Sequence, residues 1–231
     1  MKGLKITRKE KRGKNDVQII TRGVSRAGRG MLLRLKRCDV EIHFLFAAAA
    51  TLMLILDTGG TSALCLASCL AHECGHLLCL MALGENPRKI YLGVFGMRIE
   101  RTGGVRLSLA RDCLAALAGP AVNLLLAGLF AALGGRNGIG AFHKAALVNL
   151  GLALFNLLPV ETLDGGQALY YILSAGRIGE EKARQIGART SMIVLIPLIC
   201  LGAALLVHSG YNFTLLIVSA YLFLLFLYKE R

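Results

Sequence analysis

From residue 42 onward the chain is dominated by long apolar runs rather than by alternating apolar and polar positions. Six runs can be delimited, at residues 42–57, 61–83, 113–133, 142–159, 190–207 and 211–228. A helix that crosses the hydrocarbon core of a bilayer needs roughly 17–25 residues, so the runs are close to or within that length. The pattern predicts an all-α polytopic membrane protein with about six transmembrane helices.

The segment between the second and third runs has a different pattern. Apolar and polar residues alternate over 97–101 and again over 105–107, with Gly103 and Gly104 in between. Alternation on both sides of a glycine pair is typical of two short strands joined by a turn. We therefore expect a small membrane-associated β hairpin or sheet at about 89–109, between the second and third helices, with its turn at Gly103–Gly104.

Composition and charge support a membrane protein and orient it. The chain is 55% hydrophobic and only 18% charged, which argues against an ordinary soluble domain. Residues 1–41 hold 13 of the 27 Lys and Arg residues. If the N-terminus is cytoplasmic, 25 of the 27 lie on the inner side, as the positive-inside rule requires. We predict a multi-pass protein of the cell membrane, with both termini cytoplasmic and a basic cytoplasmic arm at 1–41.

The basic arm also has to be weighed as a binding segment. Nucleic-acid arms commonly interleave aromatic residues with their basic ones, and none occurs in 1–41. Contact with anionic lipid headgroups explains the same charge without a further partner. We therefore expect the arm to touch the bilayer, and we expect no nucleic acid.

Candidate chemistry is concentrated in the second run, which contains His72-Glu73-Cys74-Gly75-His76. On a helix, two histidines four residues apart lie on one face and can bind the same ion, while the glutamate beside the first can act on a bound water. A glutamate near the middle of a spanning helix is costly and usually functional. The motif predicts a metal site with His72 and His76 as ligands; packing of the three polar groups against other helices is the alternative.

Two histidines leave a catalytic zinc one protein ligand short. The fourth run ends in Asn156-Leu-Leu-Pro159, followed by Val-Glu161-Thr-Leu-Asp164-Gly-Gly. Pro159 ends the helix, and the glycine pair permits a close backbone approach. Asp164 and Glu161 are both candidates for the third ligand, and helix position alone does not decide between them.

With these motifs in place, the sequence resembles the site-2 protease family of intramembrane zinc metalloproteases. The resemblance rests on HECGH at 72–76 and LDGG at 163–166, with Gly119-Pro120-Ala-Val-Asn123 in the third run. The segment Ile42-His43-Phe-Leu-Phe resembles the entry of the compact six-span branch, which includes the stage IV sporulation protein FB. The resemblance to the family covers about residues 40–228.

The resemblance implies specific roles. His72, His76 and Asp164 would be the Zn2+ ligands, Glu73 the general base, and Asn156 a residue that engages substrate. Asn123 either orients a zinc ligand or joins two helices. Thr162 stands where the family commonly has a second proline, which bears on substrate preference, and because the chain ends at Arg231 we expect no cystathionine-synthase-like regulatory domain.

We therefore predict that residues 42–231 form a six-span membrane metalloprotease domain. It would cleave a transmembrane or membrane-tethered protein near the cytoplasmic side, a sigma factor precursor in sporulation being one candidate, with a regulatory membrane partner also conceivable. The main alternative is a non-cleaving protein of the same fold that binds or escorts transmembrane segments; the presence of Glu73 argues against it. A transporter would predict inverted repeats, and a prenyl-protein protease would predict a downstream helical glutamate ligand; neither pattern is found.

Overall fold

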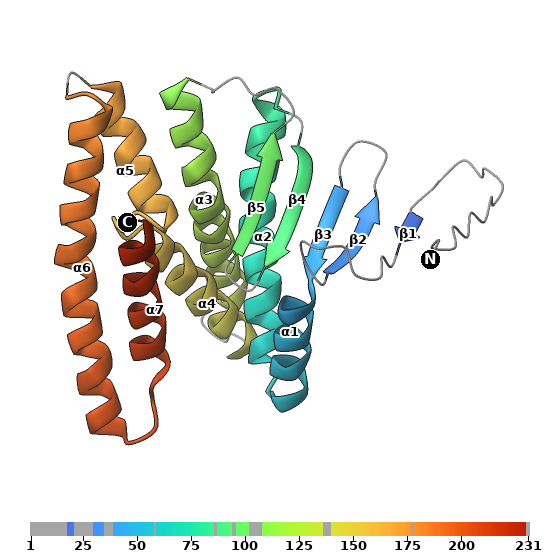
Figure 1. Ribbon diagram of the computed structural model, residues 1–231. Coiled ribbons are helices and arrows are strands. Elements are labelled where there is room, and N and C mark those ends of the chain that lie inside the picture. The colour runs from blue at the N-terminus through green and yellow to red at the C-terminus, as the bar shows by residue number, and fades with distance from the viewer. Residues whose placement is uncertain are drawn as a thin grey trace, which may run out of the picture. The chain divides into compact units, whose positions relative to one another are not determined.

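The computed structural model describes residues 18–20, 30–34, 39–57, 59–85, 87–93, 96–101, 108–135, 140–176 and 178–229 (Figure 1). The chain divides into two compact units, Met1–Met53 with Asn86–Gly103, and Leu54–Glu85 with Gly104–Arg231. Each unit is treated by itself below.

The first unit is built on a five-stranded sheet with strand order β1-β2-β3-β4-β5. The strands are β1 (Gln18–Ile20), β2 (Gly30–Arg34), β3 (Asp39–His43), β4 (Pro87–Gly93) and β5 (Gly96–Arg101). Neighbouring strands are antiparallel except β3 and β4, which are parallel. Helix α1 (Phe44–Leu56) follows β3 directly.

An ion pair joins the two parallel strands. Lys89 Nζ lies 2.8 Å from Glu41 Oε2 and donates a hydrogen bond of 2.6 Å to the Tyr91 hydroxyl. The Glu41 carboxylate, and then the Tyr91 hydroxyl, raise the pKa of Lys89 by stabilising its charged form. The pair therefore fixes the register in which Glu41 faces Tyr91.

A hairpin lies within the predicted segment, and its two described strands are β4 and β5. The chain reverses between Gly93 and Gly96, which face each other in the register of β4 and β5, so the alternating residues 97–101 pair with the strand before them. Gly103 and Gly104 lie outside the described residues, as do residues 1–17, 21–29 and 35–38 of the basic arm. Strands β1–β3 within and beside that arm were not predicted, because their apolar runs are short and interrupted by charge.

The second unit is a bundle of helices. These are α2 (Thr61–Ala82), α3 (Leu109–Gly134), α4 (Gly140–Asn156), α5 (Asp164–Ala175), α6 (Glu180–Ser209) and α7 (Thr214–Lys229). Helix α3 packs against α2, α4 and α5, while α6 packs against α5 and α7. Helix α3 is therefore the element around which the functional side chains described below are arranged.

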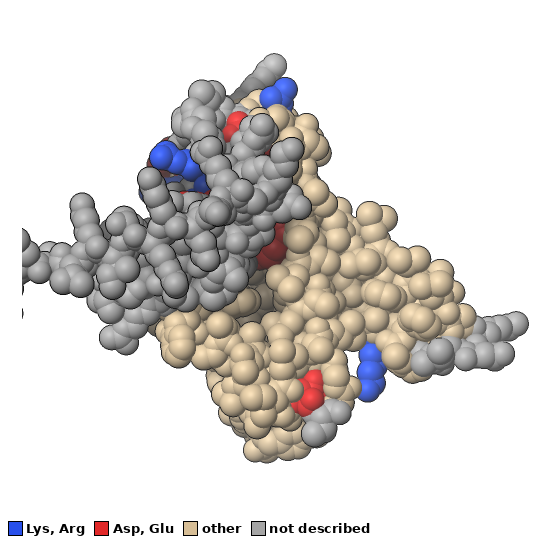
Figure 2. All heavy atoms as spheres, turned by 90° about the vertical axis from the view of Figure 1, so that its right-hand side faces the viewer, with Lys and Arg blue, Asp and Glu red and all other residues tan. Residues whose placement is uncertain are grey.

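Three helices of the described part, α2, α3 and α6, are long and apolar enough to cross a bilayer. Helices α1, α4 and α7 have 13, 17 and 16 residues, at or below the short end of the range for a span, so the six spans stay a prediction. Much of the described surface is apolar, with only scattered charged side chains in Figure 2. Such a surface is that of a membrane protein.

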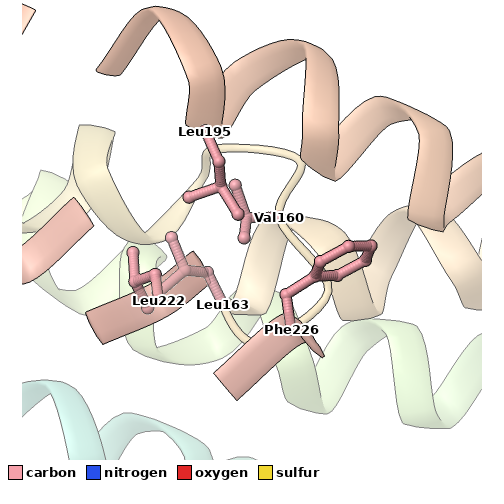
Figure 3. Packing of buried hydrophobic residues seen from close by; sticks show 5 residues of the cluster. All are labelled: Val160, Leu163, Leu195, Leu222 and Phe226. Atoms are coloured by element: carbon pink, nitrogen blue, oxygen red, sulfur yellow. The ribbon is translucent and has the colours of Figure 1, made fainter. Parts of the chain in front are cut away.

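A small apolar cluster anchors the loop between α4 and α5. It consists of Val160 and Leu163 from the loop, Leu195 from α6, and Leu222 and Phe226 from α7, all buried (Figure 3). The loop runs directly into Asp164, the first residue of α5. Burial of Val160 and Leu163 holds this loop in place, and with it the position of the Asp164 carboxylate that follows.

Candidate metal centre

Three possible ligand atoms converge between α2 and α5. Asp164 Oδ2 lies 2.9 Å from His72 Nε2 and 3.4 Å from His76 Nε2, and the two Nε2 atoms are 3.2 Å apart. Among the described residues, these side chains form the one group of His, Cys, Asp and Glu close enough to hold a metal ion together. The structure thus brings together residues 92 positions apart in the chain.

Helix geometry and small residues create this convergence. His72 and His76 are one turn apart on α2, so their rings project from one face. Gly119 of α3 faces them: a Cβ atom there would lie 2.3 Å from His76 Nε2 and 2.7 Å from His72 Nε2. At Gly75 a Cβ would come within 2.8 Å of the Ala118 carbonyl oxygen. Both glycines let α2 and α3 approach closely enough for α3 to form one wall of the site.

The position of Asp164 depends on two further glycines. After α4 ends at Asn156, the loop folds back so tightly that a Cβ at Gly165 would lie 2.2 Å from the Leu157 carbonyl oxygen. At Gly166 it would lie 2.1 Å from the Val160 carbonyl oxygen. Only glycine fits where backbone meets backbone at such distances. The LDGG motif is therefore a backbone requirement for placing the carboxylate.

The proton on each imidazole is held away from the site. His76 Nδ1 lies 2.7 Å from the Ala115 carbonyl oxygen, which can only accept a hydrogen bond, so Nδ1 is the protonated nitrogen. His72 Nδ1 lies 2.5 Å from Asn123 Oδ1 and is likewise the donor. In the neutral form of each ring, the lone pair is then on Nε2, which faces the other two possible ligand atoms. A metal-binding histidine typically has its second nitrogen fixed in this way.

The distances fit a tetrahedral ion. With metal–ligand bonds of about 2.0–2.1 Å, ligand atoms around zinc lie about 3.3 Å apart. The three separations of 2.9, 3.2 and 3.4 Å bracket that value. Two imidazole nitrogens and one carboxylate oxygen are a common catalytic zinc set, which leaves a fourth position for water. The residues present therefore fit Zn2+.

The other predicted site residues are placed as follows. Glu73 follows His72 on α2 and is partly exposed. Asn156 is the last residue of α4, and its amide donates to the Leu152 carbonyl oxygen at 3.0 Å. Glu161 is buried and its backbone N–H donates to Ser191 Oγ at 2.9 Å; it is not part of the converging group. Of the two candidates for the third ligand, the structure brings Asp164 to the histidines.

Four groups that help to form the site, two of them through hydrogen bonds to Asn123 or to each other, were not predicted from the sequence. These are Gly119, the Ala115 carbonyl, Ser68 and Asn149. Gly119 stands in the motif that includes Asn123, but a motif does not show which atoms a glycine faces. A backbone carbonyl carries no sequence signal at all. Asn149 is a polar residue inside an apolar run, a signal that could have singled it out.

The chain is similar in sequence to known zinc metalloproteases. Residues 136–198 match the model of peptidase family M50. The chain is 37% identical over 165 residues to the putative zinc metalloprotease Rip3 of Mycobacterium tuberculosis, which covers 68% of this chain and 41% of that protein. It is 26% identical over 204 residues to the zinc metalloprotease MJ0392 of Methanocaldococcus jannaschii, covering 83% and 58%. The chain thus spans less than two thirds of the length of these curated relatives.

A solved structure, the site-2 protease from Methanocaldococcus jannaschii, matches with a TM-score of 0.57 and 22% identity, covering 87% of this chain and 95% of that one. The predicted resemblance to the site-2 proteases is therefore confirmed, and the structural match shows a fold of that kind. The prediction of zinc is supported by the names of the relatives and by the His72, His76 and Asp164 group. The narrower resemblance to the compact six-span branch stays a prediction.

Proposed function

We propose that this relative of the site-2 proteases is an intramembrane zinc metalloendopeptidase that cleaves a membrane-embedded or membrane-tethered protein. The observation that carries the proposal is the convergence of His72 Nε2, His76 Nε2 and Asp164 Oδ2, with both Nδ1 atoms committed as donors elsewhere. A polar cluster serving only to join helices would not need both Nε2 atoms to converge on one carboxylate oxygen.

In this proposal His72, His76 and Asp164 hold the ion. When bound, zinc acts as a Lewis acid that makes a water molecule nucleophilic near neutral pH. Glu73 is the general base: its carboxylate accepts the proton that this water loses on attacking the peptide carbonyl, and then donates it to the leaving amine. Its place beside His72 on α2, with a partly exposed side chain, is compatible with both transfers.

Two asparagines have supporting roles in the proposal. Asn123 orients His72 through the hydrogen bond to Nδ1, which favours the first of the two roles considered from the sequence. Asn156 engages the substrate backbone. A peptide bond inside a helix is covered by its own hydrogen bonds, so the substrate has to unwind before cleavage, and its freed groups need partners in a low-dielectric site. A side-chain amide can donate to a carbonyl and accept from an N–H.

The proposed topology follows the distribution of charge. Six spans would place both termini in the cytoplasm, with 1–41 as the basic arm and 42–231 as the protease domain. His76 lies six residues before the end of α2, or about 9 Å along the helix axis. Cleavage near the cytoplasmic side is therefore part of the proposal, and a membrane-tethered sigma factor precursor is one substrate to test.

The experiment compares the wild type with Glu73→Gln, co-expressed with tagged single-span bacterial proteins. We expect a substrate fragment with the wild type only. The exposed Glu181 provides a matched control, since Glu181→Gln makes the same chemical change on α6 and should leave cleavage unchanged. Equal cleavage by Glu73→Gln would refute the assignment of the base. A wild type that binds zinc stoichiometrically but cuts none of the substrates would favour the non-cleaving alternative.

A further inference from the structure

A chain of buried side chains connects the metal centre to α4. Asn123 on α3 and Asn149 on α4 are both fully buried, and Ser68 on α2 is 3% exposed. Asn123 Nδ2 donates to Asn149 Oδ1 at 2.8 Å and to the Ser68 carbonyl oxygen at 3.2 Å. Asn149 Nδ2 donates to the Ala145 carbonyl oxygen at 2.9 Å and to Ser68 Oγ at 3.0 Å.

These hydrogen bonds have a direction that is fixed at one end. A backbone carbonyl can only accept, so the Ala145 oxygen requires the NH2 group of Asn149 to face it. The amide oxygen of Asn149 must then face Asn123. An acceptor at that position, together with the Ser68 carbonyl, requires the NH2 group of Asn123 on this side. The Asn123 oxygen is thereby left for His72.

The chain of hydrogen bonds ends at His72, where it determines which ring nitrogen carries the proton. Because Asn123 presents an oxygen, His72 carries its proton on Nδ1 and keeps Nε2 free. If the Asn123 amide turned over, its oxygen would face two other acceptors, and its NH2 group would take the lone pair of Nδ1. The proton would then sit on Nε2, where it blocks a ligand position.

We propose that Asn149, assisted by Ser68, is a positioning residue that acts through Asn123 to hold His72 in its metal-binding tautomer. The proposal rests on the proposed function, because it assumes that His72 binds the ion. It goes further in assigning a role in the metal site to a helix that supplies no ligand.

The test measures the dissociation constant for Zn2+ by competition with a chromophoric chelator, using the full chain in detergent. Asn149→Leu removes the acceptor for Asn123 while keeping the number and branching of side-chain heavy atoms, and Asn123→Leu removes the intermediate. We expect each to weaken Zn2+ binding about tenfold or more, as is typical when a hydrogen-bond partner of a ligating histidine is lost. If Asn149 acts through Asn123, the double variant should bind no more weakly than Asn123→Leu alone.

Ser68→Ala is the milder variant, should Asn149→Leu fail to fold. Its matched control is Ser219→Ala, since Ser219 is equally buried but bonds only to backbone oxygens of its own helix. We expect Ser68→Ala to weaken Zn2+ binding severalfold and Ser219→Ala to leave it unchanged. The thermal midpoint of each metal-free variant separates this effect from a loss of packing, which would lower the midpoint without changing the affinity.

The outcomes are distinguishable. Unchanged Zn2+ affinity in both Asn149→Leu and Ser68→Ala, or losses that add up in the double variant, would overturn the positioning role while leaving the metal site intact. A wild type that binds no Zn2+ would instead overturn the proposed function, and this inference with it.

Discussion

Replacing Gly119 with alanine should abolish metal binding without disrupting the helix that carries it. The added Cβ would lie 2.3 Å from His76 Nε2 and 2.7 Å from His72 Nε2, two of the three proposed ligand atoms. Alanine is otherwise a better helix former than glycine, by about 1 kcal/mol. The substitution therefore separates a requirement of the site from a requirement of α3.

The size of the effect can be worked out from these distances. Non-bonded atoms of this kind prefer separations of about 3.5 Å or more, so the His76 ring would have to move by about 1 Å. Metal–ligand distances tolerate about 0.2 Å. Displacement of one ligand and crowding of another should weaken Zn2+ binding by at least about 100-fold, the upper end of what is seen when only an outer contact is lost.

Gly128 on the same helix supplies the matched control, because a Cβ there would meet nothing within 4 Å. The assay is the shift in thermal midpoint on adding Zn2+ to the metal-free protein. A free ion concentration of 100 times the dissociation constant stabilises a folded protein by about 2.7 kcal/mol. We expect that shift in the wild type and in Gly128→Ala but not in Gly119→Ala. A full shift in Gly119→Ala would refute the placement of Gly119 against the ligand atoms.

Three more predictions concern the loop before Asp164, the metal itself, and the turn before α2. Gly166→Ala forces a Cβ to within 2.1 Å of the Val160 carbonyl oxygen and should destabilise the protein by about 1–3 kcal/mol, whereas Gly151→Ala, with open space, should not; denaturant or thermal unfolding measures both. Removal of zinc by a chelator should abolish cleavage and lower the thermal midpoint, and adding Zn2+ back should restore both; activity that survives complete removal would contradict the metal mechanism. Hydrogen bonds from the backbone N–H groups of Ser62 and Gly59 lower the pKa of Asp57. The stabilisation by the ionised carboxylate is therefore fully present above the unfolded pKa of about 4 and is lost as the pH falls through the lower folded pKa. The difference in thermal midpoint between the wild type and Asp57→Asn should shrink in that range and stay constant at neutral pH.

Features of the fold and the site that depend on residues close together in the sequence could be predicted, whereas features that depend on tertiary packing could not. The pairing of His72 and His76 follows from the helical repeat alone, and the motif at 163–166 identified Asp164 through the family resemblance. The pairing of 97–101 with the strand before it was not predicted, because alternation over 97–101 does not say whether the partner strand precedes or follows it. Strands β1–β3 were missed since each has only three to five residues and lies within or beside a segment dominated by basic residues.

The tertiary contributors could not have been predicted from local pattern. Which glycine faces the imidazoles depends on how α2 and α3 cross, and which carbonyl accepts from His76 depends on their relative height. Asn149 could be singled out as a polar residue in an apolar run, but its link to His72 passes through Asn123 on a third helix, α3. Pairwise spacing does not contain that information.

Helix α6 indicates how deep the loop before Asp164 would lie in the membrane. Its last charged residue before a long uncharged stretch is Arg189, whose exposed guanidinium would anchor at the headgroup level once the helix is inserted. Only two residues further on, or about 3 Å deeper, Ser191 receives the backbone N–H of Glu161, three positions before Asp164. With α6 inserted as proposed, this hydrogen bond would hold the loop that leads into Asp164 near the membrane surface, within reach of water.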